Sequence, residues 1–533
     1  MRYRILALLA VISVSVPLFA ACGPNSGQGS DRTIVVGITD RFTTSAAAPA
    51  PFDPAYAYDV GSWNILRNTV QTLMAVPKGD GSPVPDAAEK CSFTDRGDER
   101  YACALRPGLH FSNGDPITAA DVKFSMDRVR AIRADSGVSA LLSTVDTIET
   151  QGESGIVFHL KTADATFPFK LSTPVAGIVN PRFYGKDRLR PGFQVDASGP
   201  YTLKVDAKQG VLKKAIFAKN PQYKGAVSLK NEGVELRSFQ GSEAMGAALK
   251  AGDIDVMTRA MSPEQIRKLS DAADDAIDIV ETPGLETRFL AFNTEAPAVR
   301  NRAVRQAMAQ VIDRGELVSK VYGAQADPLY SLVAAGVTGH TNSFFNEYSE
   351  PSAKKAKAIL SDASVSYPVK LVLHYTTDHY GAATQKEFGV LRSQLNASGL
   401  FDVTIAGTPW ADFRPAERDG KYEVYGMGWF PDFPDADNYI APFLDAGNTL
   451  ASPYVNDTIR DGLIPRSRRA ANRLDAVSDL TRIQEIVATD VPIIPLWQGK
   501  QYIAVRDDIT GASYALDSSA TLRLGELQRG MKS

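Results

Sequence analysis

The residues best suited to do chemistry lie in one stretch of the second half, where aromatic and acidic side chains follow one another. Trp429 and Phe430 come directly after an apolar, glycine-spaced run, and Asp432, Asp435 and Asp437 follow them. Aromatic ring faces and carboxylates both attract an ammonium group, so this pattern predicts a site for a cationic ligand. The alternative is a surface loop whose aromatic rings seal the core and whose acids are solvated.

A strand and an irregular loop must position these side chains. The run Tyr422–Gly428 has the composition of a strand that rises to a surface. Pro431 and Pro434 exclude a helix through the acidic segment and leave backbone groups free at the strand end. The aromatic and acidic residues are therefore expected on a loop at the end of a strand.

The rest of the second half alternates predicted strands with predicted helices. The clearest helix is 303–322, which carries one apolar stripe from Val304 to Val321 and ends before Gly323. Alternation of this kind indicates an α/β architecture, and 533 residues are too many for one ordinary core. The other expected strands are 287–293, 369–374, 401–405 and 491–497, and the other expected helices are 353–360, 382–395 and 476–489.

The N-terminus has the pattern of an export signal. Arg2 and Arg4 precede the uncharged apolar run Ile5–Phe19, which is too short to span a membrane comfortably. Two alanines then precede Cys22, and a Gly/Ser-rich stretch follows to residue 31. This resembles a bacterial lipoprotein signal, although Phe19 stands where leucine is usual. We expect residues 1–21 to be removed, Cys22 to be lipidated and 22–31 to form a flexible tether; an ordinary signal-peptidase site nearby is the alternative.

The other two cysteines, Cys91 and Cys103, flank a predicted hairpin whose turn is centred near Gly97. That centre places Cys91 opposite Cys103 and Phe93 opposite Tyr101, and opposed positions are within reach of a disulfide. We therefore predict a structural disulfide. Metal binding by the two thiolates is the weaker reading, because no third or fourth ligand is nearby.

Composition and motifs argue against several functions. A net charge of −3 gives no basic footprint for nucleic acid. Signature motifs of serine hydrolases, P-loop proteins, zinc proteases and dinucleotide-binding folds are absent from the sequence, so we expect no cofactor, no metal and no catalytic residue. Paired metal ligation by His374 and His379 is disfavoured by the strand-to-loop change between them. The sequence leaves open a hydrolase that uses a pair of carboxylates.

Nine short motifs, in order along nearly the whole mature chain, resemble one family. They match the family 5 extracellular solute-binding proteins of ATP-driven importers, the dipeptide, oligopeptide and nickel group. Each motif is weak alone, and the ordered set is strong. The motifs are Phe52-Asp53-Pro54-Ala55, Leu105-Arg106-Pro107-Gly108 with Asn113-Gly114, Thr118–Val122, Gly199-Pro200-Tyr201, Asn220-Pro221-x-Tyr223, Ala251–Asp255, Phe292-Asn293-Thr294, Val304–Ala307 with Asp313-Arg314, and Trp429-x-x-Asp432 leading to Asn438.

The resemblance implies a bilobed, Venus-flytrap fold of the type II periplasmic-binding-protein class, with a mixed sheet in each lobe. Lobe I is expected over 32–284 plus 498–533, with an inserted subdomain at about 54–182, and lobe II over 285–497. The chain would cross between the lobes twice, near Gly284 and in the stretch Ile494–Trp497, and these crossings would form a hinge. Ligand would be held in the cleft between the lobes.

The resemblance also implies a function: capture of di- or oligopeptides outside the cytoplasm and delivery to the permease of an ABC importer. The Trp-x-x-Asp motif of the family supplies the carboxylate that binds the free α-amine, and it falls on Asp432. Trp429, Phe430 and Phe433 are candidate cleft walls, each with packing under the loop as the alternative. Tyr56 and Tyr58 are candidate contacts from the first lobe.

A few further expectations complete this interpretation. Arg288 is a candidate for the ligand carboxylate, with a structural salt bridge as its alternative. The protein is expected to act as a monomer, held by its lipid anchor at the outer face of the cytoplasmic membrane or in the periplasm. A receptor for another solute, such as a nickel chelate or a sugar, and an exported hydrolase are the competing functions.

Overall fold

The computed structural model describes residues 33–530 except 47, 80, 135, 197, 259–260, 272–275, 382, 447 and 449. The predicted signal sequence, the lipidated Cys22 and the tether lie outside the described residues. Among the described residues, no helix is both long enough and apolar enough to cross a membrane.

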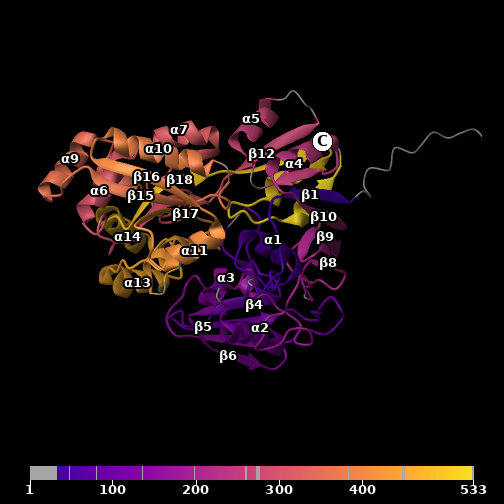
Figure 1. Ribbon diagram of the computed structural model, residues 1–533. Coiled ribbons are helices and arrows are strands. Elements are labelled where there is room, and N and C mark those ends of the chain that lie inside the picture. The colour runs from indigo at the N-terminus through magenta and orange to yellow at the C-terminus, as the bar shows by residue number, and fades with distance from the viewer. Residues whose placement is uncertain are drawn as a thin grey trace, which may run out of the picture.

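Lobe I is the part of the molecule built on a seven-stranded mixed sheet, in the order β12-β19-β11-β1-β10-β9-β8 (Figure 1). Strand β1 is the parallel partner of β10 and β11, and every one of its five residues is buried, as expected for a central strand. The strands are β1 (Ile34–Ile38), β8 (Tyr201–Lys208), β9 (Val211–Lys219), β10 (Gly233–Ser238), β11 (Val256–Thr258), β12 (Ile277–Thr282) and β19 (Gln501–Arg506). The helices are α1 (Val60–Thr69), α4 (Ser242–Ala251), α5 (Pro263–Asp271) and α15 (Ala512–Ala515).

Lobe II is built on a six-stranded mixed sheet, in the order β14-β18-β13-β17-β15-β16. Strands β16, β15 and β17 run parallel, while β13 is antiparallel to both β17 and β18. The strands are β13 (Thr287–Phe292), β14 (Ala326–Pro328), β15 (Val369–Thr376), β16 (Phe401–Thr408), β17 (Val424–Trp429) and β18 (Ile493–Gly499). The helices are α6 (Arg302–Val311), α7 (Arg314–Val321), α8 (Ser343–Tyr348), α9 (Ala353–Asp362), α10 (Thr384–Ala397), α11 (Trp410–Arg418), α12 (Asp437–Leu444), α13 (Ile464–Arg468) and α14 (Val477–Asp490).

A smaller four-stranded antiparallel sheet, in the order β4-β5-β7-β6, lies below both larger sheets in Figure 1. Its residues fall between β1 and β8 in the sequence, so the chain leaves lobe I to build it and then returns. The strands are β4 (Ala88–Phe93), β5 (Arg100–Leu105), β6 (Val145–Gln151) and β7 (Gly155–Leu160), and the helices α2 (Ala119–Ile132) and α3 (Phe167–Lys170) accompany them. Short strand pairs β2 (Met74–Ala75) with β3 (Val84–Pro85) and β20 (Ile509–Thr510) with β21 (Gln528–Arg529) complete the fold.

The predicted cysteine hairpin is present in this small sheet. Strands β4 and β5 pair Cys91 with Cys103 and Phe93 with Tyr101, which is the register that the turn at Gly97 predicts. The two cysteines form a disulfide. The pairing follows from local sequence because a hairpin register is set by the centre of its turn.

The chain passes between the two large sheets twice. The first passage joins β12 to β13 across residues 283–286, and the second joins β18 to β19 at Lys500. The two passages touch, because a Cβ added to Gly284 would lie 2.2 Å from the carbonyl oxygen of Gly499. The division of the chain into the predicted lobes stays a prediction, with these passages as the natural place for its boundaries.

The predicted helix 303–322 is wrong in one respect, because the structure divides it into α6 and α7. Ile312 is extended, and the side chain of Asp313 caps the new helix by accepting from the backbone N–H of Glu316 at 2.8 Å. The break is stabilised from outside: Gln394 on α10 accepts from the N–H of Asp313 and donates to its carbonyl. The apolar stripe cannot reveal this tertiary contact.

Candidate ligand-binding cleft

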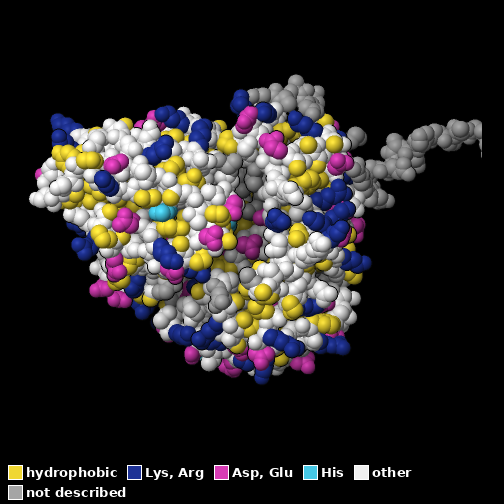
Figure 2. Space-filling model, viewed as in Figure 1, with side chains coloured by type: hydrophobic (Ala, Val, Ile, Leu, Met, Phe, Trp, Pro, Cys, Tyr) yellow, Lys and Arg dark blue, Asp and Glu magenta, His cyan; other side chains and the backbone are white. Residues whose placement is uncertain are grey.

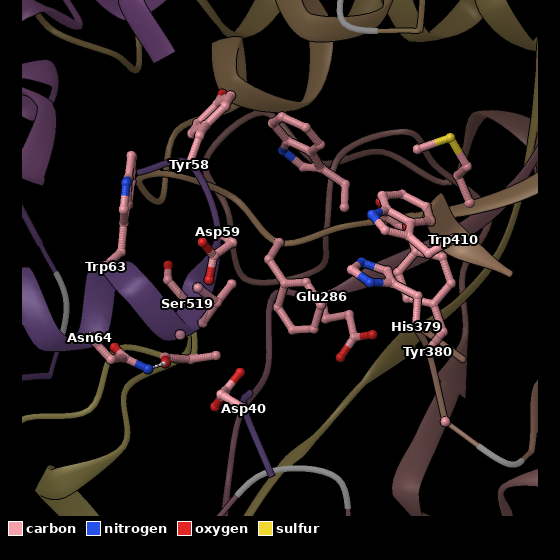
Figure 3. A pocket seen from close by; sticks show the side chains of 18 of the residues that line it. Asp40, Tyr58, Asp59, Trp63, Asn64, Glu286, His379, Tyr380, Trp410 and Ser519 are labelled. Atoms are coloured by element: carbon pink, nitrogen blue, oxygen red, sulfur yellow. Dashed lines mark hydrogen bonds between the residues drawn. The ribbon is translucent and has the colours of Figure 1, made fainter. Parts of the chain in front are cut away.

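A large cavity of about 1420 Å³ lies between the two lobes, and residues from both lobes line it. The molecular surface is hollowed where the lobes meet (Figure 2). In the close-up, Tyr58, Asp59, Trp63 and Ser519 reach in from lobe I, and His379, Tyr380 and Trp410 face them from lobe II (Figure 3). A cavity of this size can hold a multi-residue ligand.

The lobe II wall is assembled at the carboxyl ends of its three parallel strands. His379 and Tyr380 follow β15, Trp410 follows β16, and Phe430 and Asp432 follow β17. Parallel neighbours end at the same edge of a sheet, so loops far apart in sequence converge there. Ligands of open α/β sheets bind at this edge, and the cavity lies there too.

Asp432 is held by hydrogen bonds from both lobes. Its Oδ2 accepts from the hydroxyl of Tyr58 at 3.1 Å and from Nδ2 of Asn438 at 3.0 Å. Its Oδ1 accepts from no side chain or backbone N–H of the described residues, and Asp432 lines the cavity. The carboxylate is thus oriented by one oxygen while the other is available to a donor in the cleft.

Asn438 is the residue that fixes this orientation. Its Nδ2 donates to the carboxylate of Asp432. Its Oδ1 accepts from the backbone N–H of Asp432 at 2.7 Å and from Nε1 of Trp429 at 3.3 Å. Asn438 lies in the first turn of α12 and is 3% exposed. One buried amide therefore holds both ends of the Trp-x-x-Asp motif, and because the motif itself draws attention to the tryptophan and the aspartate, sequence reasoning gave Asn438 no role.

The environment of Asp432 opposes ionisation of its carboxyl group in the absence of ligand. Burial raises the pKa of Asp432 to about 6, against the opposing hydrogen bonds from Asn438 and Tyr58 and the charge of Arg67. Burial, followed by the charge of Asp432, raises the pKa of Tyr58 well above its usual value, so this hydroxyl is a donor at any physiological pH. A cation placed beside Asp432 would favour its ionised form.

The structure brings five of the six predicted ligand contacts to the cavity and leaves one outside it. Tyr56, Tyr58, Trp429, Phe430 and Asp432 all line the cavity. Phe433 is 2% exposed, belongs to the hydrophobic core of lobe I and stacks on Phe169 with ring centroids 5.6 Å apart. For Phe433 the structure thus has the packing arrangement that was the alternative to a cleft wall. The path of the loop turns the Phe433 side chain away from the cavity and into the core, and the sequence pattern does not predict that path.

The other two acids of the segment serve structure. Asp435 pairs with Arg473 at 2.7 Å, and Asp437 pairs with Arg468 at 2.9 Å. Both carboxylates are about 95% buried. Because buried acids with bidentate arginine partners are neutralised, they brace the loop and are not presented to a ligand.

Arg288 is committed to partners of its own. It pairs with Glu286, and its guanidinium lies 3.9 Å from the ring centre of Tyr380 and 5.2 Å from that of Trp497. A Cβ at Gly428, its partner across the sheet, would overlap the guanidinium, so the glycine makes room for it. Arg288 forms the salt bridge that was the alternative to carboxylate binding, and it braces Tyr380 in the cavity wall. Its Nη1 has no hydrogen-bond partner among the described residues, so its role toward a ligand carboxylate stays a prediction.

Three aromatic side chains in the cavity wall were missed by sequence reasoning. His379 stacks on Trp410 with ring centroids 3.9 Å apart and planes 4° apart, and Tyr380 meets both rings edge-on. Trp410 rests in turn on the buried Phe413. The signal that was available was positional: each follows the carboxyl end of a predicted strand.

The family model for bacterial extracellular solute-binding proteins, family 5 (Middle), matches residues 82–450. That span is well over half of the chain. The chain belongs to this family. Family 5 proteins are non-enzymatic solute-binding components of ABC transporters and act outside the cytoplasm, which corrects the hydrolase alternative.

Individual relatives and solved structures are similar to this chain over nearly their whole length. The periplasmic oligopeptide-binding protein OppA of Haemophilus influenzae is 23% identical, with 93% of this chain and 94% of the relative covered. The solved structure of DppA from Helicobacter pylori in complex with the peptide STSA matches with a TM-score of 0.78 at 21% identity, over 94% of this chain and 98% of that one. AgaA from A. tumefaciens R10, in complex with agropinic acid, also has a TM-score of 0.78, at 20% identity, over 94% and 99%. These similarities confirm the predicted α/β periplasmic-binding-protein fold.

The arrangement of the His, Cys, Asp and Glu side chains does not support metal binding. Within the part of the chain that the structure describes, no three His, Cys, Asp or Glu side chains are grouped closely enough to hold a metal ion. His374 stacks on Tyr422 in the sheet region, whereas His379 belongs to the aromatic stack of the cavity.

Proposed function

We propose that the protein captures peptides with a free α-amine in the cleft between its lobes and delivers them to the permease of an ABC importer. The observation that carries this proposal is the carboxylate of Asp432, which lines the cavity: its Oδ2 is held from both lobes, and its Oδ1 has no hydrogen-bond partner among the described residues. An ammonium placed there would make a charge-assisted hydrogen bond in a site sheltered from water. Binding the ammonium would draw on both lobes at once.

The remainder of the cavity suits an organic ligand with side chains of its own. Aromatic side chains from both lobes form its walls, among them Trp63, Tyr380 and Trp410. Rings of this kind give apolar area to ligand side chains of different shapes, and tyrosine hydroxyls and indole N–H groups add donors. The relatives named for peptides, OppA and the peptide complex of DppA, support the same ligand class for this chain.

The test of Asp432 compares two ligands that differ in one charge. A short peptide with a free amine and its N-acetylated form are titrated by calorimetry against the wild type and Asp432→Ala. We expect the substitution to weaken the free-amine peptide at least about tenfold more than the acetylated one, because the lost interaction is specific to the ammonium. Equal losses for both ligands would contradict the role of Asp432.

The ligand itself is best identified by native mass spectrometry of protein purified from peptide-rich medium. Recovery of an intact peptide supports the proposal. A bound nickel chelate, sugar or opine would instead assign the protein to another solute, and the complex of AgaA with agropinic acid shows that this fold also binds a ligand other than a peptide.

We also propose that the mature protein begins at a lipidated Cys22, that residues 22–31 tether it to the membrane and that it acts as a monomer. The lobes would be 32–284 with 498–533 and 285–497, with the subdomain at 54–182. Replacing Cys22 by alanine should release the protein from the membrane fraction while leaving its peptide affinity unchanged. Membrane retention of this variant would count against the anchor.

A further inference from the structure

Arg67 lies beside the proposed ammonium site and is unlike the other cations of the cavity. It sits near the end of α1, lines the cavity, and its guanidinium lies 5.4 Å from the ring centre of Trp63. Its hydrogen bonds go to two backbone carbonyls, that of Ser172 at 3.4 Å and that of Asp432 at 3.3 Å. Both distances are at the outer limit for N–H···O bonds, so its donors are poorly used.

The other half-buried or buried cations of the cavity already have carboxylate partners. Arg288 pairs with Glu286, Arg414 with Glu417 and Lys500 with Glu281. Arg133 and Arg418 also line the cavity, but both are exposed to solvent. Among the described residues, no carboxylate lies within ion-pair distance of Arg67.

An anion would stabilise a charged guanidinium in this position. Burial lowers the pKa of Arg67 to about 10, so it is still charged at neutral pH. The charged groups that act on it are Asp432 and Asp517, which favour its charge, and Arg523, which opposes it. Asp517 is itself paired with Arg523 at 3.0 Å. A partly desolvated cation that lacks its own anion is costly, and a ligand carboxylate would offset that cost.

We propose that Arg67 binds the carboxylate of the ligand while Asp432 binds its ammonium, so that the preferred ligands are short zwitterions of the dipeptide class. This inference rests on the proposed function, because it uses the same end of the cleft. It assigns the anion-binding group to Arg67 of lobe I in place of the lobe II candidate Arg288, whose guanidinium is already paired with Glu286.

The spacing of the two groups sets the length of the ligand. The guanidinium contacts the backbone oxygen of Asp432, and in any aspartate the backbone oxygen and the carboxylate are separated by only three carbon atoms. Arg67 and the Asp432 carboxylate are therefore on the order of 6 Å apart, about the length of one to two extended residues. A dipeptide can satisfy both charges at once, whereas the carboxylate of a longer extended peptide lies beyond Arg67.

The test uses three forms of one dipeptide, Ala-Phe: the free zwitterion, its C-terminal amide and its N-acetyl derivative. Calorimetric titrations are made with the wild type, Arg67→Met, Arg67→Lys and Asp432→Ala. Wild type should bind the free acid at least about tenfold more tightly than the amide. Arg67→Met should abolish this ratio while leaving the preference for the free amine over N-acetyl, and Arg67→Lys should restore part of the ratio.

The ratio of the affinities for the free acid and the amide also distinguishes a role of Arg67 in ligand recognition from a role in folding. A purely structural role for Arg67 would weaken all three ligands equally in Arg67→Met, and that result would overturn the inference. So would a wild type that binds the acid and the amide alike, with the dependence on Asp432 intact; the proposed function would then survive. If wild type binds none of the three dipeptides but does bind longer free-amine peptides, the preference for short zwitterions is wrong, and if no peptide binds, the proposed function fails as well.

Discussion

At the scale of single residues, the arrangement around Asp432 suits the cation-binding role that we propose for its carboxylate. Two donors hold one oxygen, and burial makes ionisation costly while no ligand is present. The loop thus stores an unfavourable charge that an ammonium can relieve. Asn438 performs the positioning, since its amide contacts both Asp432 and Trp429.

This arrangement predicts a pH dependence of binding. Because burial raises the pKa of Asp432 to about 6, the carboxyl is protonated in acid and must lose its proton to bind an ammonium. We expect the affinity for a C-terminally amidated, free-amine peptide to be constant above about pH 7 and to fall by up to tenfold per pH unit below about pH 6. Calorimetry between pH 4.5 and 7.5 measures it.

The same raised pKa of Asp432 gives the stability of the free protein the opposite pH dependence. A carboxyl whose pKa is raised by folding binds its proton more tightly in the folded state, so its contribution to stability is present below its unfolded pKa and is lost as the pH rises to about 6. Asp432→Asn should remove both dependences and is the control. A wild-type affinity that is flat from pH 4.5 to 7.5 would exclude Asp432 as the titrating group.

At the scale of elements, the cleft depends on loops that are fixed by buried ion pairs. The turn Phe52–Ala55, which leads to Tyr56 and Tyr58, is anchored by Asp53, whose two oxygens accept from Nη1 and Nη2 of Arg128 on α2. Both side chains are almost completely buried. Asp53 of the Phe52-Asp53-Pro54-Ala55 motif thus ties the start of α1, and with it Tyr58, to the small four-stranded unit.

Removing one member of this pair should be strongly destabilising. Asp53→Ala leaves the guanidinium of Arg128 buried without its anion, so we expect the free energy of unfolding to fall by about 3–5 kcal/mol. The matched control is Glu264→Ala, which removes an exposed pair with Lys268 one helical turn away and should cost less than about 0.5 kcal/mol. Urea denaturation compares the two, and similar losses would contradict the buried-pair argument.

At the scale of the whole molecule, the described residues of the two lobes meet at the two chain passages, at the loop that carries Asp432 and at Arg468. That loop follows a lobe II strand, yet Phe433 packs in the lobe I core, and Arg468 accepts a backbone hydrogen bond from Ala165 at 2.8 Å. Lobe II is thus in contact with the small four-stranded unit as well as with the seven-stranded part. Any closure of the cleft must rearrange or pivot around these contacts.

The touching passages give a test of this geometry. In Gly284→Ala the new methyl group would collide with the carbonyl oxygen of Gly499, so the passages must separate and carry the lobes with them. We expect the free energy of unfolding to fall by about 1–3 kcal/mol and peptide affinity to fall with it.

Gly389→Ala is the control, because it lies within α10 with no atom within 4 Å of the added methyl. It should be neutral or stabilising by up to about 1 kcal/mol. If the two alanine variants behave alike, the contact between the passages has no role in placing the lobes.

Much of the fold could be predicted from local patterns, and the exceptions have physical causes. Strand β17 and helix α14 follow from composition and periodicity, and the hairpin register follows from the position of its turn. The division of 303–322 into two helices depends on Gln394, some eighty residues away. The inward direction of Phe433 depends on Phe169, more than two hundred and fifty residues away.

The sequence by itself determined the family, the α/β class, the cysteine pair and the choice of Asp432, because these depend on residue type, spacing and local turns. Only the tertiary structure decided which of the candidate side chains line the cleft. It placed Arg288 in an ion pair and Phe433 in the core, and it brought Tyr58 and Asn438 to the carboxylate of Asp432 and Arg67 to its backbone carbonyl. The reason is that the direction of a side chain and the partner of a charge are set by three-dimensional packing, which no short stretch of sequence specifies.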